Sequence, residues 1–259
     1  MLSALYGGAG VRPNFAMNTL PEHLPQPGSP AWWRTRPLRV EKSGGRGRPT
    51  LSFERIIAVA LETVDEVGPQ AFNMRLLAER LESGTATLYR HVASKDEILA
   101  YVVDRVLGEL DTTAVDAAST RWQQACMCHG ERVFALLRKH PGIVPLLVAQ
   151  VPLGPNGLKV RESGIATFLA NGFAADLAAR AYTTVAHYVL GFAMQHPGAA
   201  ENEPHGEDII NFFAGLDAGQ YPAIAAAGQH LPGESVEDEF RFGLKLIIDG
   251  LGLALACEL

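Results

Sequence analysis

Cysteine is scarce in this sequence of 259 residues, and its three cysteines are too few and too odd in number for a disulfide framework. Long hydrophobic runs are also missing. The longest strongly apolar stretch, residues 244–256, is roughly half as long as a membrane-spanning helix and includes Lys245 and Asp249. Nothing at the start of the sequence resembles a secretory signal. We therefore expect a protein of the reducing cytoplasm with no membrane partner.

The charge balance is acidic, with a formal net charge of −6 at pH 7. This balance argues against a uniformly basic coat for nucleic acid, although it says nothing about a local basic patch. Hydrophobic residues make up 47% of the chain and charged residues 19%, a composition too apolar for a wholly disordered protein. The composition predicts a globular protein, and the length allows one domain of ordinary size plus a smaller module.

Residues 1–45 differ from the rest because they contain many prolines and glycines and show no sustained hydrophobic period. This composition is typical of a largely disordered extension. The end of this stretch is basic, with Glu41 opposing six cations: Arg34, Arg36, Arg39, Lys42, Arg46 and Arg48. The sequence therefore predicts a basic arm on an acidic protein.

Helical periodicity begins at Ser52, and an apolar stripe then recurs every three or four residues as far as Val67. The pair that follows, Gly68 and Pro69, predicts the end of this helix. Asn73 is a plausible N-cap for a short second helix over about 74–81.

Two more helices are expected after a turn at Gly84: a third of two turns over 85–92, and a fourth opened by Ser94 and Glu97 at capping-box spacing. Beyond Leu110 no strand-like alternation stands out. Further helices are expected near 119–139, 142–150, 157–171, 174–196, 206–218 and 235–256. The sequence predicts an all-α protein.

The third helix carries small polar and basic side chains, the layout of a helix-turn-helix that reads the major groove. Threonine and alanine can contact base edges, whereas an arginine can fork onto guanine or a phosphate. A tyrosine hydroxyl and a lysine at a helix start suit phosphates. The candidate DNA-binding residues are Arg46, Arg48, Thr85, Ala86, Thr87, Tyr89, Arg90, His91 and Lys95. The alternative is an all-α ligand-binding protein or enzyme in which this helix-turn-helix pattern has only a structural role.

Three sequence blocks resemble the DNA-binding domain of the tetracycline-repressor (TetR) family of bacterial transcription regulators: residues 77–81 (LAERL), 87–92 (TLYRHV) and 94–95 (SK). The resemblance covers about residues 46–110 and implies a recognition helix at about 85–91. It also implies an effector-responsive homodimer that binds double-stranded operator DNA, most often as a repressor. One departure concerns the turn before the recognition helix, where the family usually has a glycine and an aliphatic residue and this chain has Glu82 and Ser83.

A weaker resemblance extends to the regulatory domain of the same family, through residues 181–192 and 240–255. It implies an effector-binding and dimerisation domain over residues 111–259. Four apolar residues follow one another at intervals of four, three and four positions, which suits a seam between packed helices: Phe240, Leu244, Ile247 and Leu251. We expect helices 174–195 and 236–256 to form a four-helix interface with a second copy, the alternative being that 236–256 is core of the monomer.

The family resemblance implies a small-molecule pocket among the regulatory helices. Aromatic residues with a few polar tips suit such cavities. The candidates are Trp122, Met127, His129, Phe134, Tyr182, His187, Tyr188 and Phe192. His187 is of particular interest, since a histidine among apolar neighbours needs a partner, although each candidate taken singly is more often ordinary core.

Cys126, Cys128 and His129 raise the alternative of a metal or thiol sensor. Residues two apart on a helix point in different directions, however, so Cys126 and Cys128 cannot bind one ion together without distortion. No nucleotide-binding, zinc-protease or serine-hydrolase motif occurs. We therefore expect no metal, no cofactor and no enzymatic activity.

Overall fold

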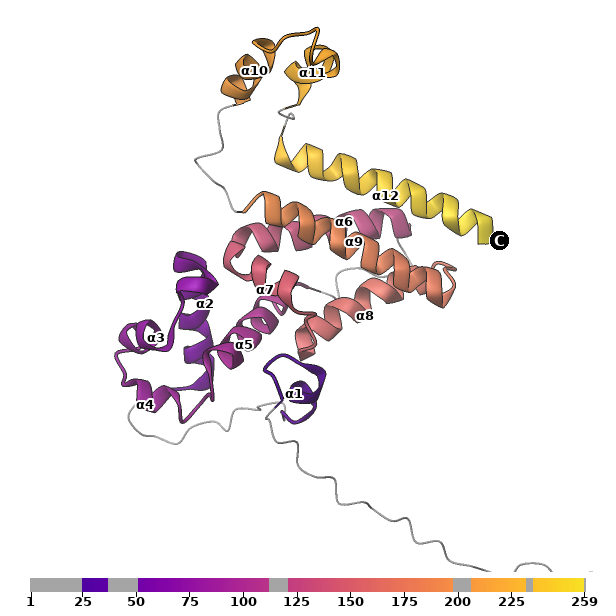
Figure 1. The fold of residues 1–259 in the computed structure, drawn as a ribbon. Coiled ribbons are helices and arrows are strands. Elements are labelled where there is room, and N and C mark those ends of the chain that lie inside the picture. The colour runs from indigo at the N-terminus through magenta and orange to yellow at the C-terminus, as the bar shows by residue number, and fades with distance from the viewer. Residues whose placement is uncertain (1–24, 37–50, 112–120, 198–205, 232–234, 259) are drawn as a thin grey trace, which may run out of the picture.

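The computed structural model describes residues 25–36, 51–111, 121–197, 206–231 and 235–258, and the regular elements in these ranges are all helical (Figure 1). The predicted all-α fold is confirmed. The N-terminal bundle consists of α2 (Phe53–Ala71), α3 (Met74–Arg80), α4 (Thr85–Leu88) and α5 (Lys95–Leu107). The C-terminal bundle consists of α6 (Trp122–Lys139), η1 (Pro141–Ile143), α7 (Val144–Ala149), α8 (Pro155–Leu169), α9 (Ala175–Gln195) and α12 (Val236–Glu258).

Local capping explains where the first helices begin. The Ser52 hydroxyl accepts a hydrogen bond from the Arg55 amide at 3.1 Å and caps α2. The Asn73 side chain accepts from two amides of α3, as its predicted N-cap role requires. Gly68, at φ +77°, interrupts α2 without ending it, because the helix resumes through Pro69 to Ala71.

The turn between α3 and α4 holds Glu82 at φ +49°, the left-handed region that favours glycine. The departure noted in the sequence therefore falls where the backbone needs a glycine-like conformation. The following helix is shorter than predicted, since α4 covers only Thr85–Leu88 and the chain then continues in turns. The Val92 amide still donates to the Leu88 carbonyl at 3.1 Å, which keeps the segment compact.

Glu97 lies at the predicted position of a capping box, and the Ser94 hydroxyl accepts from its amide at 3.1 Å. Its carboxylate accepts from the Ala93 amide at 2.7 Å, one residue before the expected partner. The Glu97 side chain is buried, and Nη2 of Arg36 lies 3.3 Å from its Oε1. The start of α5 is thus tied to a residue far earlier in the chain.

That residue belongs to an N-terminal strap, residues 25–36, which includes the short helix α1 (Pro30–Arg34). The prediction of a disordered extension is wrong for this stretch, because Trp32 is only 3% exposed. The Trp32 ring packs edge-on to Tyr101 of α5 with centroids 5.3 Å apart, and the Arg36 guanidinium lies 4.9 Å from the centre of the Trp32 ring. At the other end of the strap, Nε2 of Gln150 donates to the Pro27 carbonyl at 3.0 Å.

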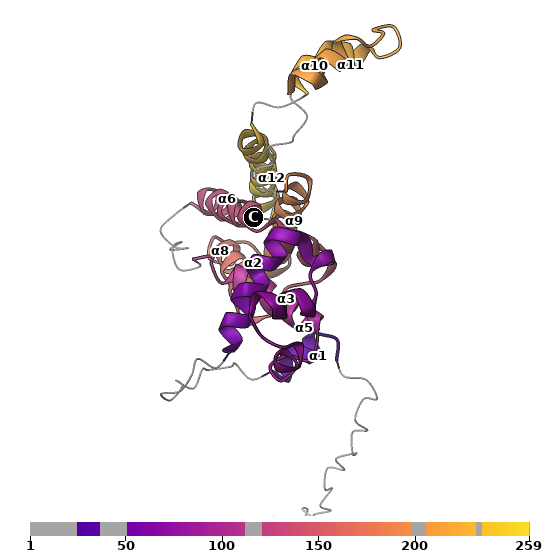
Figure 2. The same ribbon diagram turned by 90° about the vertical axis from the view of Figure 1, so that its left-hand side faces the viewer.

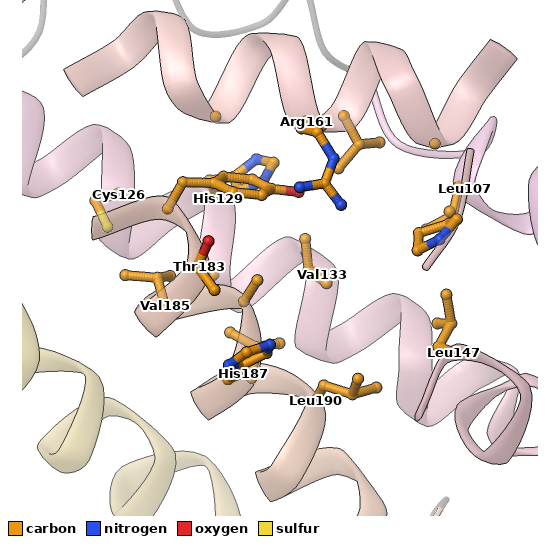
Figure 3. A pocket seen from close by; sticks show the side chains of 18 of the residues that line it. Leu107, Cys126, His129, Val133, Leu147, Arg161, Thr183, Val185, His187 and Leu190 are labelled. Carbon is orange, nitrogen blue, oxygen red and sulfur yellow. The ribbon is translucent and has the colours of Figure 1, made fainter. Parts of the chain in front are cut away.

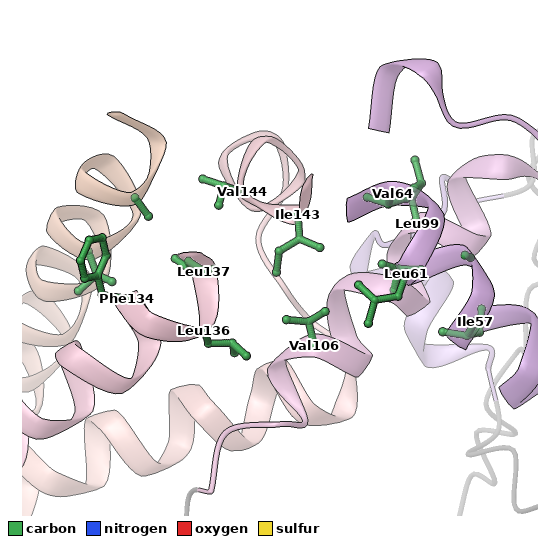
Figure 4. Packing of buried hydrophobic residues seen from close by; sticks show 14 of the residues in the cluster. Ile57, Leu61, Val64, Leu99, Val106, Phe134, Leu136, Leu137, Ile143 and Val144 are labelled. Carbon is green, nitrogen blue, oxygen red and sulfur yellow. The ribbon is translucent and has the colours of Figure 1, made fainter. Parts of the chain in front are cut away.

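The two bundles share one hydrophobic core (Figure 4). Ile143 of η1 is fully buried and belongs to the same cluster as Val64 of α2 and Val106 of α5. The backbones of η1 and α2 approach each other so closely that a Cβ on Gly142 would lie 2.5 Å from the Val64 carbonyl oxygen. Beside it, Nδ1 of His140 lies 2.6 Å from Oδ2 of Asp65, which adds a polar tie between the bundles.

The long helix α12 packs one face on α6 and α9 (Figure 2). Phe240, Leu244 and Ile248 are buried, whereas the predicted seam residues Ile247 and Leu251 are only half-buried. The seam therefore contributes to the core of the chain itself. This is the role that the sequence analysis gave as the alternative to a dimer interface for helix 236–256. A second face of α12 remains exposed and apolar, with Phe242, Leu246 and Leu253 exposed by 68%, 57% and 72%.

A hairpin of α10 (Gly206–Ala214), α11 (Pro222–Ala227) and η2 (Gly228–His230) lies beyond one end of α12 and stands apart from both bundles (Figures 1 and 2). The sequence predicted α10 but not α11. Among the described residues, none of the helices is both long enough and apolar enough to cross a membrane.

Candidate functional site

The exposed surface of α4 presents the side chains that the sequence predicted for contact with DNA. Thr85, Ala86 and Arg90 are exposed and Tyr89 is 54% exposed, while Leu88 is fully buried and anchors the short helix. Nη2 of Arg90 donates to the Thr87 hydroxyl at 3.2 Å. This contact holds the Arg90 guanidinium beside the Thr87 hydroxyl on one surface. Both groups can form hydrogen bonds with a guanine edge or a phosphate.

Two more predicted residues follow α4 in the chain. His91 is half-buried in the turn after α4, and Lys95 is the first residue of α5. Nζ of Lys95 donates to the Gln70 carbonyl at 3.5 Å and lies 5.9 Å from the centre of the Phe72 ring. Arg46 and Arg48, the predicted basic lead-in, lie outside the described residues.

A cavity of about 200 Å³ lies in the C-terminal bundle among α6, α8 and α9 (Figure 3). Its wall is mostly aliphatic, and α5 contributes Leu107 at one end. The polar side chains that line it come from the same three helices: His129, Arg161, Thr167, Tyr182, Thr183 and His187. An apolar cavity with a few convergent polar groups is the usual form of a small-molecule site.

Burial changes the protonation of two of these groups. Burial lowers the pKa of His129 and the charge of the nearby Arg132 lowers it further, so its imidazole is neutral near pH 7. Burial raises the pKa of the Tyr182 phenol, and the charge of Arg161 partly opposes this effect. Tyr182 is therefore an uncharged hydrogen-bonding group.

Three of the eight predicted effector residues line the cavity, namely His129, Tyr182 and His187. The side chain of His187 is exposed, so it needs no buried partner. The other five lie outside the lining. They are Trp122, Met127, Phe134, Tyr188 and Phe192. Trp122 packs on Phe168 and Phe173, and Phe134 stacks on Phe240 with centroids 4.3 Å apart. The Tyr188 hydroxyl donates to the Phe240 carbonyl at 2.9 Å, and Phe192 packs edge-on to Phe134.

The sequence analysis did not select Arg161, Thr167 or Thr183. Arg161 lies between Val160 and Glu162 in a stretch that also contains Lys159, so the sequence shows it as one of several charged residues on a helix. The pattern alone does not tell whether such a residue faces solvent or the interior. Figure 3 shows Arg161 and Thr183 among the side chains around the cavity.

The two cysteines of α6 have different surroundings. Cys126 is buried and lines the cavity, whereas Cys128 is exposed. In the ranges that the structure describes, no group of three histidine, cysteine or acidic side chains is placed to hold a metal ion.

Comparisons with known proteins match both bundles. A model described as bacterial regulatory proteins, tetR family, matches residues 56–102, and one described as tetracyclin repressor-like, C-terminal domain, matches residues 116–254. The HTH-type transcriptional repressor DrrR1 of Streptomyces coeruleorubidus is 28% identical over 218 residues, 81% of this chain and 80% of the relative. The class D tetracycline repressor of Escherichia coli is 27% identical over 215 residues, 81% of this chain and 93% of the relative.

Among solved structures, ActR of Streptomyces coelicolor in complex with actinorhodin is similar to this chain with a TM-score of 0.70 and 27% identity. The match covers 79% of this chain and 98% of ActR. Apo ActR matches with a TM-score of 0.73, 25% identity and coverage of 82% and 100%.

Proposed function

Since this chain belongs to the TetR family of ligand-responsive, DNA-binding transcription regulators, we propose that it is a cytoplasmic repressor that binds a pseudo-palindromic operator as a homodimer. A small molecule in the cavity among α6, α8 and α9 releases it from DNA. The observation that carries the proposal is the exposed surface of α4 on a bundle whose core continues to that cavity.

The proposed division of labour follows from the chemistry of each side chain. Thr85, Ala86, Thr87, Arg90 and His91 read base edges in the major groove. Tyr89 and Lys95 bind phosphates, and Arg46 and Arg48 contact the backbone or the minor groove. We place the DNA-binding domain at residues 46–110 and the effector-binding and dimerisation domain at residues 111–259.

The coupling between cavity and DNA runs through α5. Its first residue, Lys95, follows α4 after a short turn and contacts the Gln70 carbonyl and the Phe72 ring, and its last residue, Leu107, lines the cavity. Thirteen helical residues span about 20 Å, so one rigid helix joins the two sites. An effector that displaces the Leu107 end changes the position of α4, and operator affinity falls if the new spacing of the two recognition helices no longer fits the DNA.

The exposed apolar face of α12 supports the homodimer. Phe242, Leu246 and Leu253 recur at helical spacing on one side of this helix, and Met194 near the end of α9 is also exposed. Apolar surface of this kind marks an interface between proteins. Two copies of α9 and α12 related by a two-fold axis form the four-helix interface that we propose.

The test starts from selection of duplexes from a randomised pool by the full chain. Fluorescence anisotropy then compares the selected duplex with a scrambled one across a salt series. We expect sequence-selective binding by two chains per duplex and an affinity that falls steeply with salt. Failure to enrich any sequence, or equal affinity for both duplexes, would overturn the proposal in favour of an all-α ligand-binding protein or enzyme.

Two variants separate base reading from phosphate binding in the same assay. Arg90→Ala should lose about 1–3 kcal/mol on the selected duplex and relax the preference at one position. Lys95→Ala should weaken binding to every duplex and flatten the salt slope by about one unit. The assignment of Lys95 is wrong if its removal changes base preference.

A further inference from the structure

Arg161 brings a positive charge to the mostly apolar cavity of the C-terminal bundle. The described residues that line this cavity include the cation Arg161 and no aspartate or glutamate. Arg161 is half-buried, and its guanidinium lies 5.2 Å from the centre of the Tyr182 ring. Among the described residues, no carboxylate lies within ion-pair distance of it. A cation so placed favours an anion that comes from outside the chain.

We infer that the effector is a largely apolar molecule with an acidic group, and that this acidic group pairs with Arg161. This inference rests on the proposed function of the cavity as the effector site. The guanidinium can donate two parallel hydrogen bonds to a carboxylate, sulfonate or phenolate. The aliphatic side chains around it then cover the apolar body of the molecule.

The other polar groups of the cavity sharpen this preference. His129 is neutral because burial lowers its pKa, so it offers a hydrogen bond without a second positive charge. Thr167 and Thr183 donate their hydroxyl protons to the Ser163 and Ala179 carbonyls, so their oxygens can accept hydrogen bonds from hydroxyl groups on the body of the ligand. Together these groups fit a molecule with one acidic group and hydroxyl substituents.

Tyr182 and Gly164 position the arginine. A Cβ on Gly164 would lie 2.7 Å from Cδ2 of Tyr182, so the glycine makes room for the ring against α8. The ring in turn supports the Arg161 guanidinium through a cation–π contact. Arg161 is thereby held by a stacking contact that leaves its hydrogen-bond donors for a ligand.

The experiment uses two fluorescent probes of similar aromatic body on the full chain. The first, 1-anilinonaphthalene-8-sulfonate, carries an acidic group, and the second, N-phenyl-1-naphthylamine, lacks it. We expect Arg161→Gln to weaken binding of the sulfonate about tenfold or more and to leave the neutral probe nearly unchanged. Arg161→Lys should retain much of the sulfonate affinity, because it keeps a cation at this place.

Three controls make the result specific. Lys159→Gln removes an exposed cation from the same helix and should change neither probe. Leu190→Trp fills the cavity and should weaken both probes. Operator binding, measured on the same preparations without probe, should be unchanged in Arg161→Gln, which separates a failure of this inference from a failure of the proposed function. The inference is overturned if the sulfonate does not bind, if Leu190→Trp leaves its binding intact, or if Arg161→Gln affects both probes equally or neither.

Discussion

At the scale of single residues, Cys126 and Cys128 show how burial separates two identical side chains. They are two positions apart on α6, yet Cys126 is buried and Cys128 is exposed. Burial raises the pKa of the Cys126 thiol to about 12. The thiolate is the reactive form of cysteine, and at pH 8 only about one Cys126 in ten thousand carries it.

We therefore predict that iodoacetamide at pH 8 alkylates Cys128 and Cys257, both exposed, and leaves Cys126 unmodified. Fragment mass spectra of the peptide that contains both α6 cysteines identify the modified one. The same reaction in concentrated urea, where burial is lost, should modify all three cysteines. Modification of Cys126 in the folded chain as fast as Cys128 would contradict this prediction and revive a thiol-sensor role.

Glu82 is another residue whose conformation the sequence only partly predicted. The family resemblance marked it as a place where glycine is usual, and the structure gives it φ +49°. The family resemblance identified position 82 as unusual, but only the backbone of the structure shows the left-handed conformation that explains why glycine is usual there.

At the scale of elements, local signals were predicted well and distant contacts were not. Asn73 and Ser94 cap helices through amides two or three residues away, so a short stretch of sequence contains the whole interaction. The N-terminal strap depends on contacts with Tyr101, Glu97 and Gln150, which come much later in the chain. Its composition is rich in proline and glycine, which predicted disorder, although Ser29 and Pro30 form a local helix start.

The strap gives a prediction for Arg36. Because Arg36 lies beside the buried Glu97 carboxylate and over Trp32, Arg36→Ala leaves a buried charge without its nearby cation. We expect the free energy of unfolding to fall by about 1–3 kcal/mol, measured by urea denaturation followed by circular dichroism. Amide exchange at the start of α5 should also become faster.

The matched control is Arg34→Ala, which removes an exposed arginine from α1 itself. It should unfold within about 0.5 kcal/mol of the unchanged chain. Equal unfolding midpoints for the two variants would mean that the Arg36 contacts do not stabilise the fold.

At the scale of the whole molecule, the proposed dimer depends on the exposed face of α12. Leu246→Glu places a charge in the middle of this face, so we expect the two-chain species to dissociate at micromolar concentration. Size-exclusion chromatography with light scattering measures the mass. Operator affinity should fall as well, because two recognition helices no longer bind as one unit.

Leu169→Glu is the matched control, since Leu169 is also an exposed leucine but lies on α8. It should leave the mass of the assembly unchanged. A dimer that survives Leu246→Glu, or dissociates equally in both variants, would place the interface elsewhere.

The lining of the cavity is a property of the whole molecule, because it depends on how α6, α8 and α9 are rotated relative to one another. Aromatic residues were reasonable candidates from the sequence, but Phe134, one of them, stacks on Phe240 in the core instead. Arg161 faces the cavity because Gly164 and Tyr182 set the approach of α8 and α9. Such a relation between helices has no signature in either helix alone.

The strap also affects how the chain is made. Pro27 leaves the ribosome before Gln150, which binds it and follows 123 residues later. A contact between such distant residues closes a large loop and forms late in folding. Until α5 emerges, Trp32 has no Tyr101 against which to pack. Docking of the strap therefore comes after the helices that it joins, and the fluorescence of Trp32 can report when it docks.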